Sequence, residues 1–307
     1  MRVTPHSNAV EIYCLALLLW RDNFLAPLKK QATGALLSLI EQERVGRAIN
    51  TRLLSSALHS FLELGANEKS INAEEPLCAL YEEIFEDAFL AETVRFYSRL
   101  SAEYLEQRPV TKYLTAALRC ISEEDHRVRS YMHESTLQPL LKICDKVLIE
   151  DHADRLSTEF QELLRREKDA DLGRMYILAS RVPSALALLR TLFQEHVQRE
   201  GLQAIERLGE DVKDPALYVT TLLRVHQKYN ELVRSAFARD EDFVNAMGNA
   251  CEKFVNNNAA TRPPNSSIRS SELLAQYCNS LLLKGSSSAH VPDPEDALKQ
   301  ATIVLVF

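Results

Sequence analysis

The sequence predicts an all-α protein made of long amphipathic helices, and three observations lead to this fold class. Apolar residues recur at the i, i+3, i+4, i+7 spacing of a helix along most of the 307 residues. Glycine is scarce, at 8 residues, and no segment shows a clear alternation of β-branched residues that would predict a strand. A composition that is 46% hydrophobic and 26% charged is ordinary for a folded chain, and the length allows two or three compact units or one extended array.

The first helix is expected over the apolar run "IYCLALLLW" at residues 12–20. This run is shorter than the roughly 20 residues that span a bilayer. Glu11 before it and "RDN" after it favour a buried helix over a signal peptide. We therefore expect no membrane partner and a location in the cytoplasm or the nucleus.

Two apolar stripes and two proline signals predict helices further along. One stripe comprises Val110, Tyr113, Leu114, Ala117, Leu118 and Ile121, and the other comprises Leu222, Val225, Tyr229, Leu232, Val233 and Ala236. Asp214 before Pro215 predicts a capped helix start, because proline has no N–H to lose in the first turn. Pro183 lies inside a helical pattern over residues 172–197 and should kink or divide that helix.

The segment 129–152, "RSYMHESTLQPLLKICDKVLIEDH", holds the residues that most resemble a reactive site. As a zinc motif it fails, because H-E-x-x-H needs a second histidine where Leu137 stands. As a nucleophile site it lacks a G-x-S-x-G elbow, and the adjacency of His133, Glu134 and Ser135 in sequence is no evidence for a triad.

The same segment is explained better as a helix. Ser135 and Gln138 match the S-x-x-Q form of a capping box, and Pro139 suits a first turn. Cys144 is then a core thiol, on an apolar stripe made of Leu137, Leu140, Leu141, Cys144, Val147 and Leu148. His152 falls at the margin of this stripe, as a packed or hydrogen-bonded side chain. The pattern resumes through Leu164, so a helix could cover residues 137–166, a rod of about 40 Å if unbroken.

Three segments without helical spacing are expected to be loops: residues 65–76 and 256–271 between helical groups, and residues 284–296 as a mobile surface loop. The chain closes on "ATIVLVF", and free apolar residues are unfavourable in water by about 25 cal/mol per Å² exposed. Either this segment packs against a partner or the chain lacks what normally follows it, and we favour truncation.

Charge and cysteine usage restrict the function further. A net charge of −7 argues against nucleic acid as the main partner. Widely spaced cysteines without a C-x-x-C pair indicate buried thiols in a reducing compartment; they are Cys14, Cys78, Cys120, Cys144, Cys251 and Cys278. Two acidic clusters, at residues 82–87 and 123–125, are interpreted as solvated helix faces. No glycine-rich phosphate loop is present. We predict no catalytic, cofactor or metal site and no enzyme activity.

Several blocks of the sequence resemble the N-terminal region of the cullin family, and within it the cullin-1 branch. They are "FLAETVRFYSRLSAEYLEQRPVTKYL" at residues 89–114, "RVRSYMHEST" at 127–136, "DADLGRMYILASRV" at 169–182, "LYVTTLLRVHQKYNELVRSAF" at 217–237 and "SSELLAQYCNSLLLKG" at 270–285. The resemblance runs in colinear order from about Val10 to Phe307.

The resemblance implies an elongated stalk of stacked cullin repeats, each a bundle of five helices. It divides the chain into a non-matching tail at 1–9, the end of a first repeat at 10–70, a second repeat at 71–200 and a C-terminally truncated third repeat at 201–307. It also implies a scaffold of SCF-type ubiquitin ligases in ubiquitin-dependent protein degradation. Such a scaffold holds an adaptor with its F-box receptor at one end and a RING protein at the other, and it interacts with a cullin-exchange factor.

Two departures limit what the resemblance assigns. "MRVTPHSN" does not resemble the adaptor-contacting helices of the family, and Phe307 precedes the family's RING-binding domain with its modified lysine. We therefore expect a partial cullin in which adaptor and RING binding are doubtful and the partner-binding residues are unknown.

Two other functions stay open. One is a helical tethering or trafficking adaptor, because long-helix bundles of similar build serve there. The other is a helical hydrolase that uses Ser135 or Cys144.

Overall fold

The computed structural model describes residues 12–66, 79–258, 269–284 and 302. Most of the predicted loops at 65–76 and 284–296, and the terminal "ATIVLVF" apart from Thr302, lie outside these residues. Within the described part, helices and turns account for all regular structure and no strand occurs, which confirms the all-α prediction. The chain forms two compact units, residues 1–151 (unit 1) and 152–307 (unit 2).

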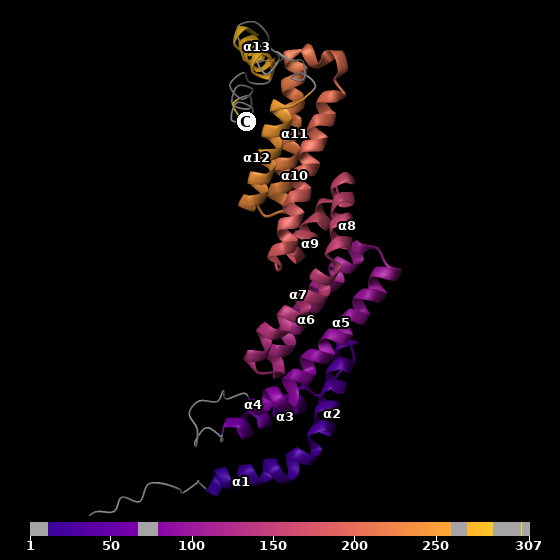
Figure 1. Ribbon diagram of the computed structural model, residues 1–307, viewed down its shortest axis with the longest axis vertical. Helices are drawn as coiled ribbons and strands as arrows, with labels where there is room; N and C mark the ends of the chain where they lie inside the picture. The colour runs from indigo at the N-terminus through magenta and orange to yellow at the C-terminus, as the bar shows by residue number, and fades with distance from the viewer. Residues whose placement is uncertain (1–11, 67–78, 259–268, 285–301, 303–307) are drawn as a thin grey trace, which may run out of the picture. The chain divides into compact units, whose positions relative to one another are not determined.

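Unit 1 begins with two helical paths that each contain a π-helical turn. The first path is α1 (Ile12–Trp20), η1 (Arg21–Leu25) and α2 (Ala26–Arg44), and the second is α4 (Ala79–Tyr81), η3 (Glu82–Glu86) and α5 (Asp87–Gln107). The residues that flank each π-helical turn keep helical dihedral angles, so neither path is interrupted. The axis of the first path bends between α1 and α2 (Figure 1), as helices often do at a π-helical turn.

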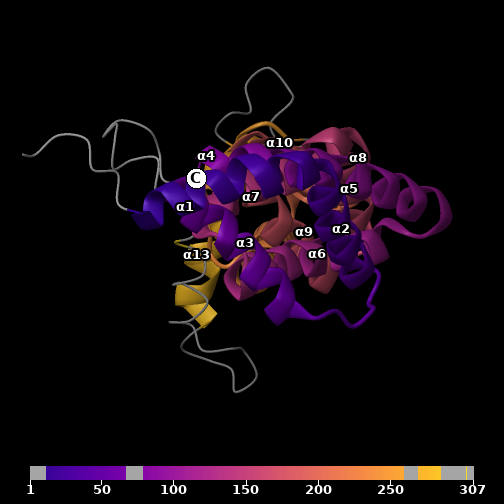
Figure 2. The ribbon, with the colours of Figure 1, turned by 90° about the horizontal axis from the view of Figure 1, so that it is seen from below.

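Four further elements complete unit 1: α3 (Thr51–Ala66), α6 (Val110–Tyr131), the 3₁₀ turn η4 (Glu134–Thr136) and α7 (Leu137–Leu148). α5 packs on α6 and α7, and α3 packs on α6 and α4, while α2 contacts α5. Figure 2 shows α1, α2 and α3 from below. The predicted stripe on α6 is confirmed, since all its members are buried except the half-buried Leu118.

The single helix predicted over residues 137–166 is wrong. α7 ends at Leu148, Ile149 leaves helical geometry, and the 3₁₀ turn η5 (Glu150–His152) precedes α8 (Ala153–Arg165). Ile149 is fully buried, so the apolar pattern runs through the break. Because a 3₁₀ turn alters the period over only three residues, the spacing of apolar residues cannot reveal the break.

Unit 2 comprises α8, α9 (Asp169–Ala179), α10 (Pro183–Glu206), the 3₁₀ turn η6 (Gly209–Lys213), α11 (Pro215–Ala236), α12 (Glu241–Asn256) and α13 (Arg269–Lys284). α10 is central and packs on α8, α9, α11 and α12 (Figure 1). The division predicted at Pro183 is confirmed, since α9 ends at Ala179 and α10 begins at the proline. The predicted cap is confirmed too: Asp214 Oδ1 accepts the backbone N–H groups of Ala216 and Leu217 at 2.8 and 3.4 Å.

The core of unit 2 contains closely packed rings on α10, on α12 and directly after the end of α11. Phe193 and Phe237 lie edge to face with centroids 5.4 Å apart, and Phe243 lies 4.4 Å from Phe237. Gly201 on α10 allows the ring of Phe254 on α12 to pack against the α10 backbone, because a Cβ there would stand within 2.7 Å of three ring carbons of Phe254. The stripe predicted on α11 is confirmed, as all six of its residues are buried.

Three expectations about boundaries have different outcomes. The loop predicted at 256–271 is too long, because Asn256 is the last residue of α12 and α13 already begins at Arg269. The repeat boundary at 70/71 falls outside the described residues, and the one at 200/201 falls inside α10, so the repeat division stays a prediction.

No helix among the described residues is long and apolar enough to cross a membrane.

Candidate functional site

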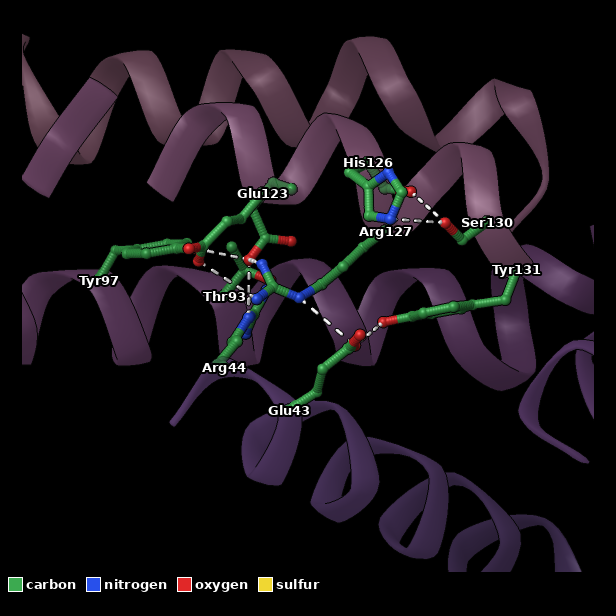
Figure 3. A network of polar contacts seen from close by, with 10 residues as sticks. Glu43, Arg44, Thr93, Tyr97, Glu123, His126, Arg127, Ser130 and Tyr131 are labelled. Atoms are coloured by element: carbon green, nitrogen blue, oxygen red, sulfur yellow. Dashed lines mark hydrogen bonds and ion pairs between the residues drawn. The ribbon is translucent and has the colours of Figure 1, made fainter. Parts of the chain in front are cut away.

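The most unusual side-chain arrangement in unit 1 is a buried ionic network centred on Glu124 of α6. Figure 3 shows Arg44, Tyr97 and Arg127, which belong to this network. The carboxylate is fully buried, and its Oε1 accepts three hydrogen bonds. Arg44 Nε donates at 2.8 Å, Arg127 Nη1 at 3.0 Å and the Tyr97 hydroxyl at 2.5 Å. Two guanidinium groups and a phenol therefore share one carboxylate oxygen.

Three helices bring these groups together. Arg44 is the last residue of α2, Tyr97 lies on α5, and Glu124 and Arg127 lie one turn apart on α6. The Arg44 guanidinium also donates to Thr93 Oγ1 at 2.8 Å and lies 5.1–5.3 Å from three ring centroids, those of Phe89, Phe96 and Tyr97. Cation–π contacts of this kind favour the charged form and hold the side chain in an apolar setting.

At its outer edge the network opens toward a polar cavity of about 730 Å³. There Arg127 Nε lies 3.5 Å from Glu43 Oε2, and the Tyr131 hydroxyl donates to the same oxygen at 2.6 Å. The cavity is lined by Glu43, Arg44, Val45, Gly46, Arg119, Ser122, Glu123, His126 and Arg127. The lining includes two carboxylates and three guanidinium groups, so charges of both signs face the cavity.

The arginines of the network stay charged and its tyrosines stay neutral near neutral pH. Burial alone would lower the pKa of Arg44, but the charge and hydrogen bond of Glu124 more than offset it, so the pKa is raised. The pKa of Arg127 is raised by the same balance. Burial raises the pKa values of Tyr97 and Tyr131 as well, with the nearby carboxylates adding to the rise. These groups hold their protons near neutral pH, so the network fits a structural role.

The interpretation of the acidic clusters as solvated faces is wrong at two positions. Glu124 is the centre of the network, and Glu86 is 6% exposed with its pKa raised by burial. The helical period contains a signal for Glu124 that we missed: it falls on the apolar stripe between Ile121 and Val128. A charged residue in such a stripe indicates a buried ion pair, although the period cannot say that its partner is Arg44.

His133 and Ser135 are brought together, but in a turn. The Ser135 hydroxyl oxygen lies 2.8 Å from His133 Nδ1, and the Ser135 backbone N–H donates to the same nitrogen at 3.3 Å. His133 thus caps η4. The predicted capping box of Ser135 and Gln138 is wrong, because the N-cap of α7 is Thr136, which has helical dihedral angles and no side-chain capping bond. Thr136 is buried, and its hydroxyl is hydrogen-bonded to that of Tyr81 at 2.8 Å.

The thiols of the described residues are confirmed as core groups at three positions. Cys120, Cys144 and Cys251 are buried and free of disulfides, while Cys278 is half-buried. Burial raises the pKa of Cys120 to about 11, that of Cys251 to about 12 and that of Cys144 further still. A thiol in this state is a poor nucleophile. His152 is half-buried in η5, and the described residues contain no cluster of three metal-ligating side chains.

Comparison with known proteins gives the class to which this helical architecture belongs. The family model described as "Cullin alpha solenoid domain" matches residues 2–307 and thus includes most of the tail that we had set apart at 1–9. The chain belongs to the cullin family.

The curated relatives include several cullin-1 proteins. The chain is similar to Cullin-1 of Dictyostelium discoideum, with 39% identity over 298 residues, which are 97% of this chain and 38% of that protein. It is similar to Cullin-1 of Caenorhabditis elegans, with 38% identity over 98% of this chain and 40% of the relative. Cullin-1 of Schizosaccharomyces pombe is 33% identical over 97% of this chain and 39% of the relative. The chain therefore spans 38–40% of the length of these three relatives.

Proposed function

We propose that this chain is a non-catalytic scaffold arm of a cullin-RING ubiquitin ligase of the SCF type, which spaces a substrate adaptor from the RING module. The observation that carries the proposal is the cullin match over residues 2–307, joined by cullin-1 relatives that are 33–39% identical. The proposed setting is ubiquitin-dependent protein degradation in the cytoplasm, the nucleus or both.

The physical build of the two units supports a spacing role. A spacer has to keep its length when its ends carry partners, so its helices must not rearrange. Unit 1 ties α2, α5 and α6 together through the Glu124 network, and unit 2 packs four helices around α10.

The proposed partners are an adaptor with its F-box receptor, a RING protein and a cullin-exchange factor, with no nucleic acid, cofactor or membrane. Because the chain spans 38–40% of its cullin-1 relatives, each partner is a separate proposal. We expect the adaptor to bind weakly or not at all. The division into cullin repeats at 10–70, 71–200 and 201–307 is part of the same proposal.

Affinity recovery from cell extract tests the proposal. The tagged chain is compared with two variants, Glu124→Ala in unit 1 and Gly201→Leu in unit 2, which disrupt one core each. We expect ubiquitin-ligase components to be enriched over a tag-only control. A component that binds to one unit should no longer be recovered with the variant in which that unit is disrupted. Recovery of membrane-coat or tethering proteins without ligase components would instead support a trafficking adaptor.

Two direct measurements test the finer parts. Nanomolar binding of purified adaptor to this chain would contradict the expected weakness of that contact. Covalent labelling of Ser135 or Cys144 by an active-site-directed probe would contradict the non-catalytic assignment.

A further inference from the structure

Cations surround a buried histidine in unit 2. His196 on α10 is 2% exposed, and both of its ring nitrogens have partners. Nε2 lies 3.0 Å from the hydroxyl of Tyr229 on α11, and Nδ1 lies 3.3 Å from Nη2 of Arg199, three residues further along α10. The ammonium group of Lys228 lies 5.2 Å from the ring centroid of Tyr229. Two buried rings therefore contact two cations that reach the surface.

Arg199 is held by a neutral group and not by a carboxylate. The residue is exposed, and within the described part of the chain no carboxylate lies within ion-pair distance of its guanidinium group. Burial, together with the charges of Arg199, Lys228 and Arg165, lowers the pKa of His196 to about 4, so its ring is neutral near neutral pH. A carboxylate would offset the charge of Arg199, whereas a neutral acceptor leaves that charge available to a partner.

One carboxylate of the chain already lies among these cations and indicates the chemistry that they accept. Glu167, just after the end of α8, accepts a hydrogen bond from the Lys228 ammonium group at 2.6 Å. Both side chains are exposed, at 64% and 42%, so the pair is weak and can exchange with another carboxylate. Positive charge is in excess here: the cations are Arg165, Arg166, Lys168, Arg199 and Lys228, and the carboxylates beside them are Glu162, Glu167 and Glu200.

We propose that these five cations form a docking surface for an acidic segment of a partner protein, whose carboxylates pair with Arg199 and displace Glu167 from Lys228. Complementary charges of this kind select a partner and speed its association. A short acidic segment is favoured over nucleic acid, because the net charge of −7 repels a polyanion whose charge extends over many phosphates. The inference does not rest on the scaffold function, since it concerns the charges of unit 2 alone.

Fluorescence anisotropy with the purified full chain tests the proposal. The probe is a labelled oligoglutamate peptide, and an oligoglutamine peptide of the same length is its uncharged counterpart. We expect only the glutamate peptide to bind, and to bind more weakly as salt is added, because salt screens exposed charge pairs. Arg199→Glu should weaken binding by more than about tenfold, since like charges then meet, whereas Arg199→Lys should retain most of it. The matched control Arg95→Glu makes the same charge change at an exposed arginine of unit 1 and should leave binding unchanged.

A second variant tests the displacement of Glu167. Glu167→Gln leaves Lys228 without its competing carboxylate, so it should strengthen peptide binding by up to about fivefold, which is the equivalent of one exposed ion pair. Its matched control is Glu210→Gln, which removes the same charge from an exposed carboxylate of unit 2 that is paired with Lys213. This control should leave binding unchanged. Circular dichroism of every variant establishes that the helices are retained.

Three results would overturn the proposal. The first is a glutamate peptide that does not bind to the native chain at low salt. The second is an Arg95→Glu variant that weakens binding as much as Arg199→Glu, or a Glu167→Gln variant that binds no better than Glu210→Gln. The third is an oligonucleotide that binds more tightly than the glutamate peptide and is lost in Arg199→Glu, because the occupant would then be a nucleic acid.

Discussion

Replacing Glu124 with alanine leaves two buried guanidinium groups without the carboxylate that they share. The side chains of Arg44 and Arg127 are 3% and 6% exposed, so water cannot replace the lost partner. Removing one member of a buried ion pair typically costs about 3–5 kcal/mol, and the hydroxyl of Tyr97 also loses its acceptor. We expect Glu124→Ala to lower the free energy of unfolding of unit 1 by about 4 kcal/mol.

Urea denaturation followed by two signals measures this change. Circular dichroism reports all helices, whereas the fluorescence of Trp20, the sole tryptophan of the chain, reports unit 1. The control is Glu123→Ala, which removes the neighbouring carboxylate on the same helix. Glu123 is 44% exposed and lies 3.5 Å from Arg119 and Arg127, so its loss should cost less than about 1 kcal/mol.

A third variant tests whether the penalty arises from unpaired charge. The combined substitution of Arg44→Met, Glu124→Leu and Arg127→Leu removes all three charges of the buried triad, and apolar replacement of a buried ionic triad is often neutral or stabilising. We expect it to recover most of the stability lost in Glu124→Ala. A loss below about 1 kcal/mol in Glu124→Ala, or a triple variant less stable than it, would refute the reasoning.

Three further predictions concern unit 2. Gly201→Ala should destabilise it by about 1–3 kcal/mol in urea, because the new Cβ collides with the ring of Phe254, while Gly173→Ala, which meets only ordinary contacts, should not. Asp214→Ala should cost about 1 kcal/mol by removing the α11 cap, and Asp214→Asn should restore most of it. Burial lowers the pKa of His196 from 6.5 to about 4. As the pH falls, this histidine is therefore protonated in the unfolded chain at a higher pH than in the folded chain. Stability should therefore decrease between pH 6.5 and 4, by up to about 3 kcal/mol, and His196→Gln should flatten that decrease.

Local patterns in the sequence predict much of this fold because their causes are local. The stripes on α6 and α11 follow from helical spacing and from the need to bury apolar area. The starts of α10 and α11 follow from proline and aspartate chemistry within a few residues. Long, strongly periodic segments are where such reasoning succeeds.

The errors occur where a distant residue or a short irregular turn decides the structure. The partner of Glu124 is Arg44, 80 positions away in sequence, so nothing near Glu124 predicts its burial except its place in the stripe. Ahead of α7, Thr136 is hydrogen-bonded to Tyr81, 55 positions away, and His133 caps the short turn η4, which the S-x-x-Q pattern does not indicate. The break after Leu148 needs only one 3₁₀ turn, which the apolar pattern crosses without interruption.

The Glu124 network also defines where α2 lies along its own axis. The rows of apolar side chains repeat along a helix. A helix held only by apolar contacts can therefore pack in alternative positions that differ by about one turn, or 5.4 Å, along its axis. The hydrogen bond from Arg44 to the Glu124 carboxylate, at 2.8 Å, has no equivalent one turn away. A shift of α2 along its axis by even one residue, about 1.5 Å, would take Arg44 out of hydrogen-bonding range. α2 therefore has a single packing position along its axis in unit 1. Substitutions on its apolar face can loosen the helix, but the position to which it returns is set by the two acceptors of Arg44, Glu124 Oε1 and Thr93 Oγ1, and by the bond from Tyr131 to Glu43.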